Sequence, residues 1–498
     1  MTRPDDATAL HRQARESIRL MLSRRMLILL LTFASGIVLA RTLTPSDFGL
    51  FAVAFFVTTV ARMLAELGFS QVLIQRPGAL EPHMLQTAFT IQQAVSVLAF
   101  VALWPLAAWV PHFYPQLSGD LVALIRVLSL QLLVLAWADM SETILERSLS
   151  FERLAPIEVL GSVTYNATTL TLALAGYGVW SLAYGSVIAT VVRAGLAYRA
   201  APWPVRLRID RSAADVLWRR GLTILVGRMV TQGQYWVTPT LVAGTIGPAA
   251  TGLLQWAAGN GKKPIEVLES AVRVSLPHFS QLQHDGREVE RILARYVTAF
   301  ALVCALWLVV LALAGADLVA LVYGARWVPA ATAMTLFAAA GLLVSGGVIV
   351  TTALIGLGRM AFATRIGTCG AAVTLLASAA LVLMIGPLGV PIGQLAGAAL
   401  TLPWLVSGLG PGAFGRVIGP ARAIVAPAAV ALVVGTAVRY AGAAALGDSL
   451  APGFRGLLTA GTMTLAYLAT AWWYGPEWLR RAARGEALPS GDAVAERI

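Results

Sequence analysis

Charged residues are scarce in this sequence. Asp, Glu, Lys and Arg together make up 12% of its 498 residues, while 58% are hydrophobic and the mean hydropathy is +0.74. Ordinary soluble domains are about 25% charged, so this composition excludes a soluble enzyme and a disordered chain. Long polar segments are also lacking, because the longest polar connection, near residues 199–215, is far below the size of a domain. The function must therefore reside in helices within the membrane.

Cysteine and histidine are few as well. The two cysteines, Cys304 and Cys369, each lie in an apolar run, which excludes a disulfide framework and a CxxC metal site. The five histidines lie outside the apolar runs or at their ends, and the sequence has no HExxH, GxSxG or Walker A motif. We therefore expect no enzyme activity, no ATP-driven pumping by this chain, and no metal or cofactor. The excess of 12 positive charges lies between apolar runs, so no nucleic-acid partner is expected.

The sequence is rich in long apolar runs, each near the roughly 20 residues that cross a hydrocarbon core. With the amino terminus placed inside and the sides alternating, the inside segments hold 25 arginines and the outside segments hold 4. This bias is typical of short cytoplasmic loops. The sequence therefore predicts an all-α, multi-pass plasma-membrane protein with both termini in the cytoplasm. We expect fourteen spans, at residues 22–43, 48–70, 84–110, 121–145, 156–176, 178–198, 217–246, 248–278, 293–315, 329–357, 361–385, 387–408, 422–441 and 455–474.

A weak internal repeat bears on how these helices are organised. Residues 39–54 and 242–257 share six identities in sixteen positions, at an offset of 203 residues. The match is either chance similarity between two apolar helix turns or the trace of two related six-helix halves, as in many transporters. On the second interpretation, we expect a cytoplasmic amphipathic segment at residues 1–25, six-helix halves at 26–198 and 217–408, a cytoplasmic linker at 199–216, two additional helices at 409–474 and a cytoplasmic tail at 475–498.

Ionisable residues inside the apolar runs are candidate functional residues, because a charge in the bilayer costs about 2.5–3.5 kcal/mol on insertion scales. Arginine and lysine suit a phosphate-bearing ligand, and carboxylates could bind a coupling cation. Arg62 and Glu66 are four residues apart and could instead form a structural ion pair, while the carboxylates near residue 140 could be a solvated helix end. Arg193 is expected to snorkel to the interface. The substrate-binding candidates are Arg62, Arg126, Arg228, Gln232, Lys262 and Lys263, and the ion-coupling candidates are Glu66, Asp139 and Glu142.

Two of the predicted spans are interrupted by glycine and polar residues. The interruptions lie at residues 227–239 of the seventh span and 259–264 of the eighth. Such breaks at membrane depth are tolerated only against protein or water, and they point to a transporter's binding site. The eighth run is either two short helices with a broken middle or one helix whose cytoplasmic half is interfacial.

Three stretches resemble the Wzx-type polysaccharide transporters, also called oligosaccharide flippases, of the multidrug/oligosaccharidyl-lipid/polysaccharide exporter superfamily. They are LARTLTPSDFGLFAVAFFVTTVARMLAELGFSQVLIQR (residues 39–76), LPHFSQLQHD (276–285) and VYGARWVPAA (322–331). The resemblance implies an alternating-access bundle that flips an undecaprenyl-pyrophosphate-linked oligosaccharide for O-antigen, capsule or exopolysaccharide biosynthesis. The implied partners are this substrate, membrane lipids, and the polymerase and export machinery of polysaccharide assembly. The resemblance supplies no invariant residues. The candidate substrate-binding and ion-coupling residues therefore rest on the physical arguments alone.

Two other functions stay open at this point. One is a cation-coupled exporter of drugs or other small molecules with the same architecture, which would favour an acidic, aromatic cavity over a cationic one. The other, less favoured, is a membrane enzyme of polysaccharide assembly. A polymerase or ligase would need a large external loop and an acyltransferase would need a histidine within the membrane, and the sequence has neither.

Overall fold

The computed structural model describes residues 28, 30–76, 78, 80–117, 119–265, 286–446, 452–474, 476 and 480–481. Within these residues the regular secondary structure is entirely helical. This confirms the all-α class predicted from the apolar runs. The predicted amphipathic segment at 1–25 lies outside the described residues, as does nearly all of the predicted tail at 475–498.

The chain divides into two compact units. The first unit comprises residues 1–229 and 243–249, and the second comprises 230–242 and 250–498. The division therefore falls within helix α10 (Arg211–Gly233) and not within the expected linker at 199–216. The six-helix halves stay a prediction, and the two units are described separately below.

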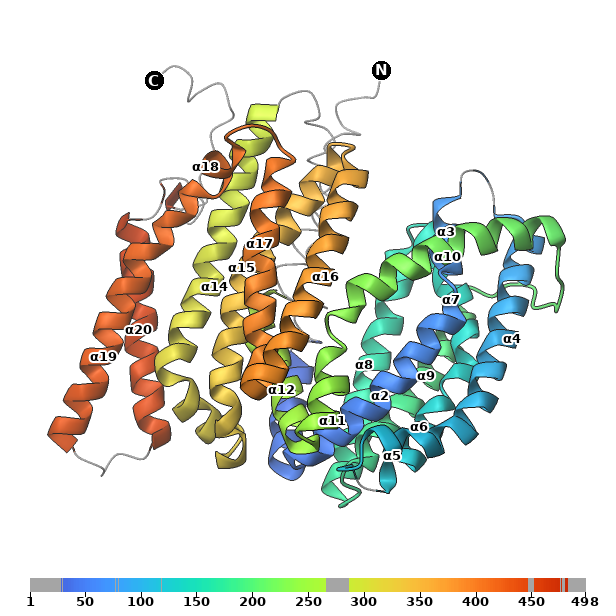
Figure 1. Cartoon of the computed structure of the whole chain (residues 1–498), viewed down its shortest axis with the longest axis horizontal. Helices are drawn as coiled ribbons and strands as arrows, with labels where there is room; N and C mark the ends of the chain where they lie inside the picture. The colour runs from blue at the N-terminus through green and yellow to red at the C-terminus, as the bar shows by residue number, and fades with distance from the viewer. Residues whose placement is uncertain are drawn as a thin grey trace. The chain divides into compact units, whose positions relative to one another are not determined.

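The first unit is a bundle of helices packed around several apolar clusters. Its core includes Leu121, Leu124, Ile125 and Leu128, each fully buried, which recur at the spacing of one helix face. Its helices, of which Figure 1 labels the α-helices, are α2 (Pro45–Glu66), α3 (Phe69–Gln75), α4 (Pro82–Leu106), η1 (Ala107–Trp109), α5 (Val110–Phe113), α6 (Asp120–Ser129), α7 (Leu132–Arg147), α8 (Phe151–Leu174), α9 (Trp180–Ala200), most of α10 and α11 (Ala243–Thr245).

The start of α2 illustrates how local sequence fixes these helices. The side chain of Thr44 accepts a hydrogen bond from the Asp47 amide at 3.2 Å, and the Asp47 carboxylate accepts one from the Thr44 amide at 2.8 Å. This reciprocal capping box satisfies two amides that would otherwise lack partners at the helix start. Pro45 occupies the first turn, where its missing N–H costs nothing.

The second unit packs its helices around a separate apolar cluster that includes Leu293, Val350, Leu354 and Val406. In Figure 1 its last two helices, α19 and α20, run side by side. The helices of this unit are η2 (Thr238–Val242), α12 (Pro248–Gly261), α14 (Gly286–Val322), η3 (Ala325–Ala330), α15 (Ala331–Gly356), α16 (Met360–Ile385), η4 (Gly386–Leu388), α17 (Gly389–Ser407), α18 (Ala413–Val417), η5 (Gly419–Ile424), α19 (Val425–Leu446) and α20 (Pro452–Tyr474).

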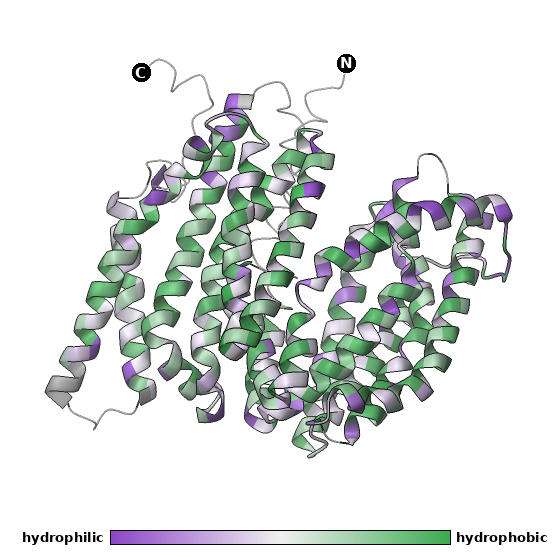
Figure 2. Cartoon of the chain, viewed as in Figure 1, coloured by the Kyte–Doolittle hydropathy of each residue, from purple (hydrophilic) through white to green (hydrophobic). Residues whose placement is uncertain are grey.

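Eight helical segments of the described residues are long and apolar enough to cross a membrane. The protein is therefore a multi-pass membrane protein, and Figure 2 shows hydrophobic residues along most of the length of its long helices. Each of the fourteen predicted runs contains a described helix. The number of helices that cross the bilayer, and the side on which the termini lie, stay predictions.

Both predicted interruptions are present in the structure. In the seventh run, α10 ends at Gly233, a turn follows at residues 234–236, and the chain resumes as the π-helix η2. In the eighth run, α12 ends at Gly261 and Lys262 lies in a turn. The two interpretations of the eighth run differ in residues beyond 265, which lie outside the described ranges.

Candidate functional site

The first polar site is built where α2 gives way to α3. Leu67 and Gly68 both adopt positive φ values, 53° and 69°, which stops α2 directly after Glu66. Helix α10 crosses this bend closely, because a Cβ on Gly221 would collide with the Leu67 carbonyl and a Cβ on Gly68 would lie 2.8 Å from the Gly221 carbonyl. The close crossing allows Arg228, two turns further along α10, to donate to the Glu66 carboxylate at 2.8 Å.

This pairing differs from the ion pair considered on sequence grounds. Glu66 and Arg62 share a face of α2, yet the guanidinium that contacts Glu66 comes from α10. The sequence spacing could not indicate this, because Glu66 and Arg228 are 162 residues apart. The Glu66 side chain is 10% exposed, so a charge-assisted hydrogen bond offsets much of the cost of burying it.

Helices α7 and α9 supply a second ion pair. The Arg193 guanidinium donates through Nε and Nη2 to the two oxygens of Glu142, each at 2.6 Å. This two-pronged geometry is the strong form of an arginine–carboxylate contact. The expectation that Arg193 snorkels to the interface stays a prediction, and the structure adds that its charged end is held by Glu142. One turn before Glu142, Asp139 accepts a hydrogen bond at 2.6 Å from Nε2 of Gln92, a fully buried side chain of α4.

These groups surround a cavity of about 180 Å³, which we call the first-unit cavity. Four carboxylates and two guanidinium groups line it, and Arg228 pairs with one of the carboxylates. Among the described residues, the site therefore has one carboxylate charge in excess, which would suit a proton or a single small cation. The volume is enough for several water molecules. The lining side chains include Arg62, Glu66, Ser70, Gln71, Asp139, Glu142, Thr143, Glu146, Thr190 and Arg193.

The second polar site lies at the end of α12. Gly261 ends this helix against α15, where a Cβ would lie 2.5 Å from the carbonyl oxygen of Met334. The Gly261 carbonyl accepts a hydrogen bond at 3.1 Å from the Trp307 indole, so this end of the helix has a partner away from water. Any side chain at position 261 would push the two helices apart. The break in the sequence thus fixes where the next residue, Lys262, leaves the helix.

Lys262 is held by polar and aromatic groups. Its Nζ donates to Oε1 of Gln394 at 2.6 Å and lies 5.3 Å from the ring of Tyr235 and 5.2 Å from that of Phe337. Both ring distances are within the range of a cation–π interaction. Although neither aromatic residue carries a negative charge, the amide oxygen and the two ring faces all favour an ammonium group.

A cavity of about 430 Å³, the second-unit cavity, opens beside Lys262. Lys262 is the one charged side chain among the described residues that line it. Its other polar groups are amides and hydroxyls, and much of the remaining wall is glycine and alanine. Small side chains leave room for a bulky ligand. The polar lining residues are Gln234, Tyr235, Lys262, Thr351, Thr352, Thr374, Gln394 and Thr401.

Close packing of α16 against α17 shapes one wall of this cavity. A Cβ on Gly370 would overlap Thr401 of α17, and a Cβ on Gly397 would overlap Thr374 of α16. Such glycine contacts let membrane helices approach closely. They also bring Gln394 on α17 within reach of Lys262 on α12.

The structure separates the sequence-predicted residues into three groups. Arg62, Glu66, Asp139 and Glu142 line the first-unit cavity, where Arg228 joins them through Glu66, and Lys262 lines the second-unit cavity. Gln232 and Lys263 flank residues of the second-unit cavity without being among its lining residues. Arg126 lines neither cavity, since it donates to the Trp104 carbonyl at 3.1 and 3.3 Å and lies 5.4 Å from the Trp104 ring.

One residue of the second polar site, Tyr235, was not singled out in the sequence. Tyr235 directly follows the polar stretch of the seventh run, but one aromatic residue in an apolar run carries no distinctive signal. Gln92 and Gln394 are rare amides inside apolar runs, a sequence signal that reveals a polar environment without revealing which partner meets it.

Comparison with known proteins adds a family and a fold. A model of the family described as polysaccharide biosynthesis protein matches residues 38–332, more than half of the chain. The succinoglycan biosynthesis transport protein ExoT of Rhizobium meliloti (strain 1021) is 24% identical over 256 residues, which cover 51% of each chain. The teichuronic acid biosynthesis protein TuaB of Bacillus subtilis (strain 168) is 25% identical over 294 residues, covering 57% of this chain and 59% of that protein. The matches thus span about half of the length of these relatives.

Among solved structures, the fold is similar to that of the lipid II flippase MurJ in an inward closed conformation. The TM-score is 0.71, and the superposition covers 90% of this chain and 98% of that one at 13% identity. At this identity the likeness concerns the fold alone. It agrees with the all-α membrane architecture predicted from the sequence.

Proposed function

The chain belongs to the polysaccharide biosynthesis protein family, and from this premise we propose that it is a flippase for a lipid-linked oligosaccharide. The substrate would be an undecaprenyl-pyrophosphate-linked oligosaccharide, moved across the plasma membrane by alternating access for the biosynthesis of O-antigen, capsule or exopolysaccharide. Similarity to a succinoglycan transport protein supports this substrate class, and the fold shared with a lipid II flippase supports transport of a lipid-linked cargo.

The observation that carries the proposal is the position of Lys262 at the wall of the second-unit cavity. Its ammonium would contact the pyrophosphate, because a charge-assisted hydrogen bond to a phosphate oxygen is stronger than one between neutral groups. The hydroxyls and amides beside it, such as Thr374 and Gln394, would meet sugar hydroxyls. We propose Gln232 and Lys263 as substrate contacts that flank this cavity. Arg126 is proposed as a further substrate contact, near the beginning of the predicted span at residues 121–145.

We assign energy coupling to the first-unit cavity. Glu66 and Glu142 are each held by a guanidinium, whereas the hydrogen-bond donor that the structure gives Asp139 is the neutral amide of Gln92. Of these three carboxylates, Asp139 is therefore the one on which a proton or cation would be exchanged most readily. Replacing it by asparagine should abolish the response of transport to a pH or sodium gradient, and Glu152→Gln, at an exposed carboxylate of α8, should not.

A cation-coupled exporter of small organic molecules is the second candidate. The acidic excess in the first-unit cavity favours it, since organic cations bind to carboxylates. The second-unit cavity favours the flippase, because an ammonium at its wall repels organic cations. We propose transport without enzymatic activity, with the termini in the cytoplasm and a polysaccharide polymerase and export machinery as partners.

The test is leaflet-resolved transport of a fluorescent undecaprenyl-pyrophosphate oligosaccharide in proteoliposomes. The wild type should flip the lipid, Lys262→Ala should flip it about tenfold more slowly, and Arg422→Ala, at an exposed arginine that is not among the candidates, serves as the control. Equal loss in both variants would remove Lys262 from its assigned role. Gradient-driven efflux of organic cations, with no flipping of any lipid-linked glycan, would replace the flippase by the exporter.

A further inference from the structure

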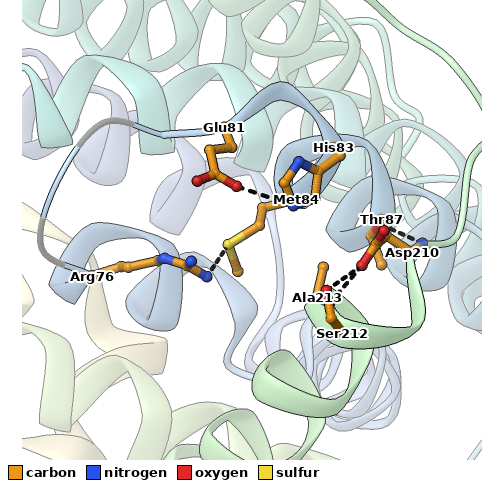
Figure 3. Close-up of polar contacts among 8 residues, drawn as sticks. All are labelled: Arg76, Glu81, His83, Met84, Thr87, Asp210, Ser212 and Ala213. Carbon is orange, nitrogen blue, oxygen red and sulfur yellow. Dashed lines mark hydrogen bonds and ion pairs between the residues drawn. The ribbon is translucent and has the colours of Figure 1, made fainter.

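The segment that joins α9 to α10 is an extended strap, defined here as residues 203–210, and it is fixed to α4. The Thr90 and Thr87 hydroxyls accept hydrogen bonds from the amides of Arg208 and Asp210 at 3.1 and 3.0 Å. Gln86 donates to the Pro204 carbonyl at 3.2 Å. Figure 3 shows Asp210 beside Thr87, with Ser212 and Ala213 at the start of α10. The strap backbone is thus supplied with partners by one face of a single helix.

The strap is also anchored at its beginning. Trp203 is 5% exposed, and its ring meets that of Phe89 edge-on with centroids 4.9 Å apart. These contacts fix the backbone of the strap and therefore also fix which of its side chains point away from the protein. Those side chains alternate between cationic and aliphatic: Arg206, Leu207, Arg208 and Ile209 are all exposed, Leu207 by 78% and Ile209 by 62%.

The first turns of α10 continue this surface. Ala213, Leu217, Gly221 and Leu225 recur every four residues and are buried, so this stripe faces the protein. Other faces carry exposed residues of the same mixed kind as the strap, including Trp218 at 46% and Leu222 at 38%. In Figure 1 this half of α10 runs across the end of the first unit, at a steep angle to α4, and Figure 2 shows hydrophilic residues along it. The exposed cations and apolar residues here are Arg211, Trp218, Arg219, Arg220 and Leu222.

The length of the neighbouring span places the strap at the depth of lipid headgroups. Helix α4 has 25 residues, which is about 38 Å of helix, whereas a hydrocarbon core is about 30 Å thick. The ends of this span therefore extend into the headgroup layers. The strap contacts residues 86, 87 and 90, which lie within about 12 Å of the beginning of α4.

The strap and the first turns of α10 carry a net positive charge. Residues 206–222 contain five arginines and two aspartates, and Asp215 pairs with Arg219 at 2.8 Å. A fixed surface that mixes aliphatic, indole and guanidinium groups at headgroup depth matches an anionic phospholipid, whose phosphates meet the cations and whose upper acyl chains meet the apolar groups. We propose that the strap and the first turns of α10 form a binding surface for anionic phospholipids, independent of the cargo that the protein carries.

The two cysteines of the chain allow a site-specific test. With Cys304→Ala and Cys369→Ala as background, Leu207→Cys carries a fluorophore, and the protein is reconstituted in phosphatidylcholine vesicles with about a third phosphatidylglycerol. Nitroxide-labelled phosphatidylglycerol should quench the fluorophore at least about twice as strongly as nitroxide-labelled phosphatidylcholine. Molar salt should remove the difference, because it screens charges over a few ångströms.

Arg206→Gln with Arg208→Gln should abolish the preference for phosphatidylglycerol. Arg153→Gln with Arg422→Gln, which removes two exposed arginines elsewhere, should preserve it. The hydrogen bonds that fix the strap to α4 use backbone atoms of the strap, so the first variant should fold, and circular dichroism checks this. Equal quenching by the two lipids in the unmutated strap overturns the proposal, as does a preference that survives the loss of both strap arginines or molar salt.

Discussion

The two cavities stabilise their charged side chains in opposite ways. In the first-unit cavity, charges are stabilised by other charges, as in the pairs of Glu66 with Arg228 and Glu142 with Arg193. In the second-unit cavity, Lys262 is stabilised by an amide oxygen and two aromatic rings. The difference implies that removing one charge from the first cavity leaves another without its partner, whereas the amide and the two rings described around Lys262 are neutral groups.

Arg193→Met provides the largest test of this contrast. The substitution leaves the Glu142 carboxylate, 12% exposed, without its two-pronged partner. Loss of one partner of a buried pair costs about 3–5 kcal/mol, and because Arg193 is itself 45% exposed we expect about 2 kcal/mol of destabilisation. Thermal unfolding in detergent micelles would measure it.

The double variant Arg193→Met, Glu142→Leu supplies the control. It removes both charges together, so most of the lost stability should return, since replacing a buried ion pair by apolar residues is often neutral. If the double variant is as unstable as the single one, the pair contributes through packing and the contrast with Lys262 fails.

Lys262→Met should have the opposite effect from Arg193→Met, with little change in stability and a clear loss of substrate affinity. Methionine keeps an apolar stem of similar length, so the unfolding temperature should change little, while affinity for undecaprenyl pyrophosphate falls about tenfold because one charge-assisted contact is lost. Lys262→Arg should recover part of the affinity. Binding is measured in micelles, separately from the transport assay. A Lys262→Met protein with a lowered unfolding temperature and an unchanged affinity would contradict the role of Lys262 as a pyrophosphate contact.

The sequence was informative about which residues are costly to bury and uninformative about their partners. Arg62, Glu66, Asp139, Glu142, Arg228 and Lys262 all drew attention as charges in apolar runs, and each lies in or beside one of the two cavities. The partner of Glu66 could not be predicted, because it depends on α10 crossing α2 at Gly221 and Gly68. Arg126 stood out for the same reason as the others, yet it contacts the carbonyl of Trp104.

The helices were predictable for a related reason. Apolar runs of span length are set by the bilayer and are visible in the chain itself, and glycine with polar residues marked both interruptions. The separation of the chain into units within α10 was not predicted, because the interruption at residues 227–239 was interpreted as part of a binding site and the boundary was placed in the polar linker at 199–216.

Gly397→Ala sharpens the comparison by disturbing the second-unit cavity without touching a charge. Its Cβ would overlap Thr374, forcing α16 and α17 apart, and we expect about 1 kcal/mol of destabilisation. Gly367→Ala is the matched control, because it lies on the same cavity and its Cβ would meet nothing within 4 Å. Should the two variants unfold at the same temperature, helix proximity at Gly397 does not shape this cavity.

The smallest effect concerns a charge outside both cavities, at Asp210. Hydrogen bonds from the Ser212 hydroxyl and the Ala213 amide hold the pKa of this exposed carboxyl below its usual range. A lowered folded-state pKa means that the contribution of Asp210 to stability is present above about pH 4, the unfolded value, and is lost as the pH falls through the folded value.

Asp210→Asn should therefore leave stability at neutral pH almost unchanged, because asparagine also caps helices well, and should slightly reduce the loss of stability on acidification. Asp215→Asn is the control, since that carboxylate pairs with Arg219 on the exposed surface. Thermal unfolding of the three proteins, compared between neutral and acidic pH, measures the difference. A change at Asp210 as large as that expected for Arg193→Met would contradict the argument that a charge matters most where water cannot replace its partner.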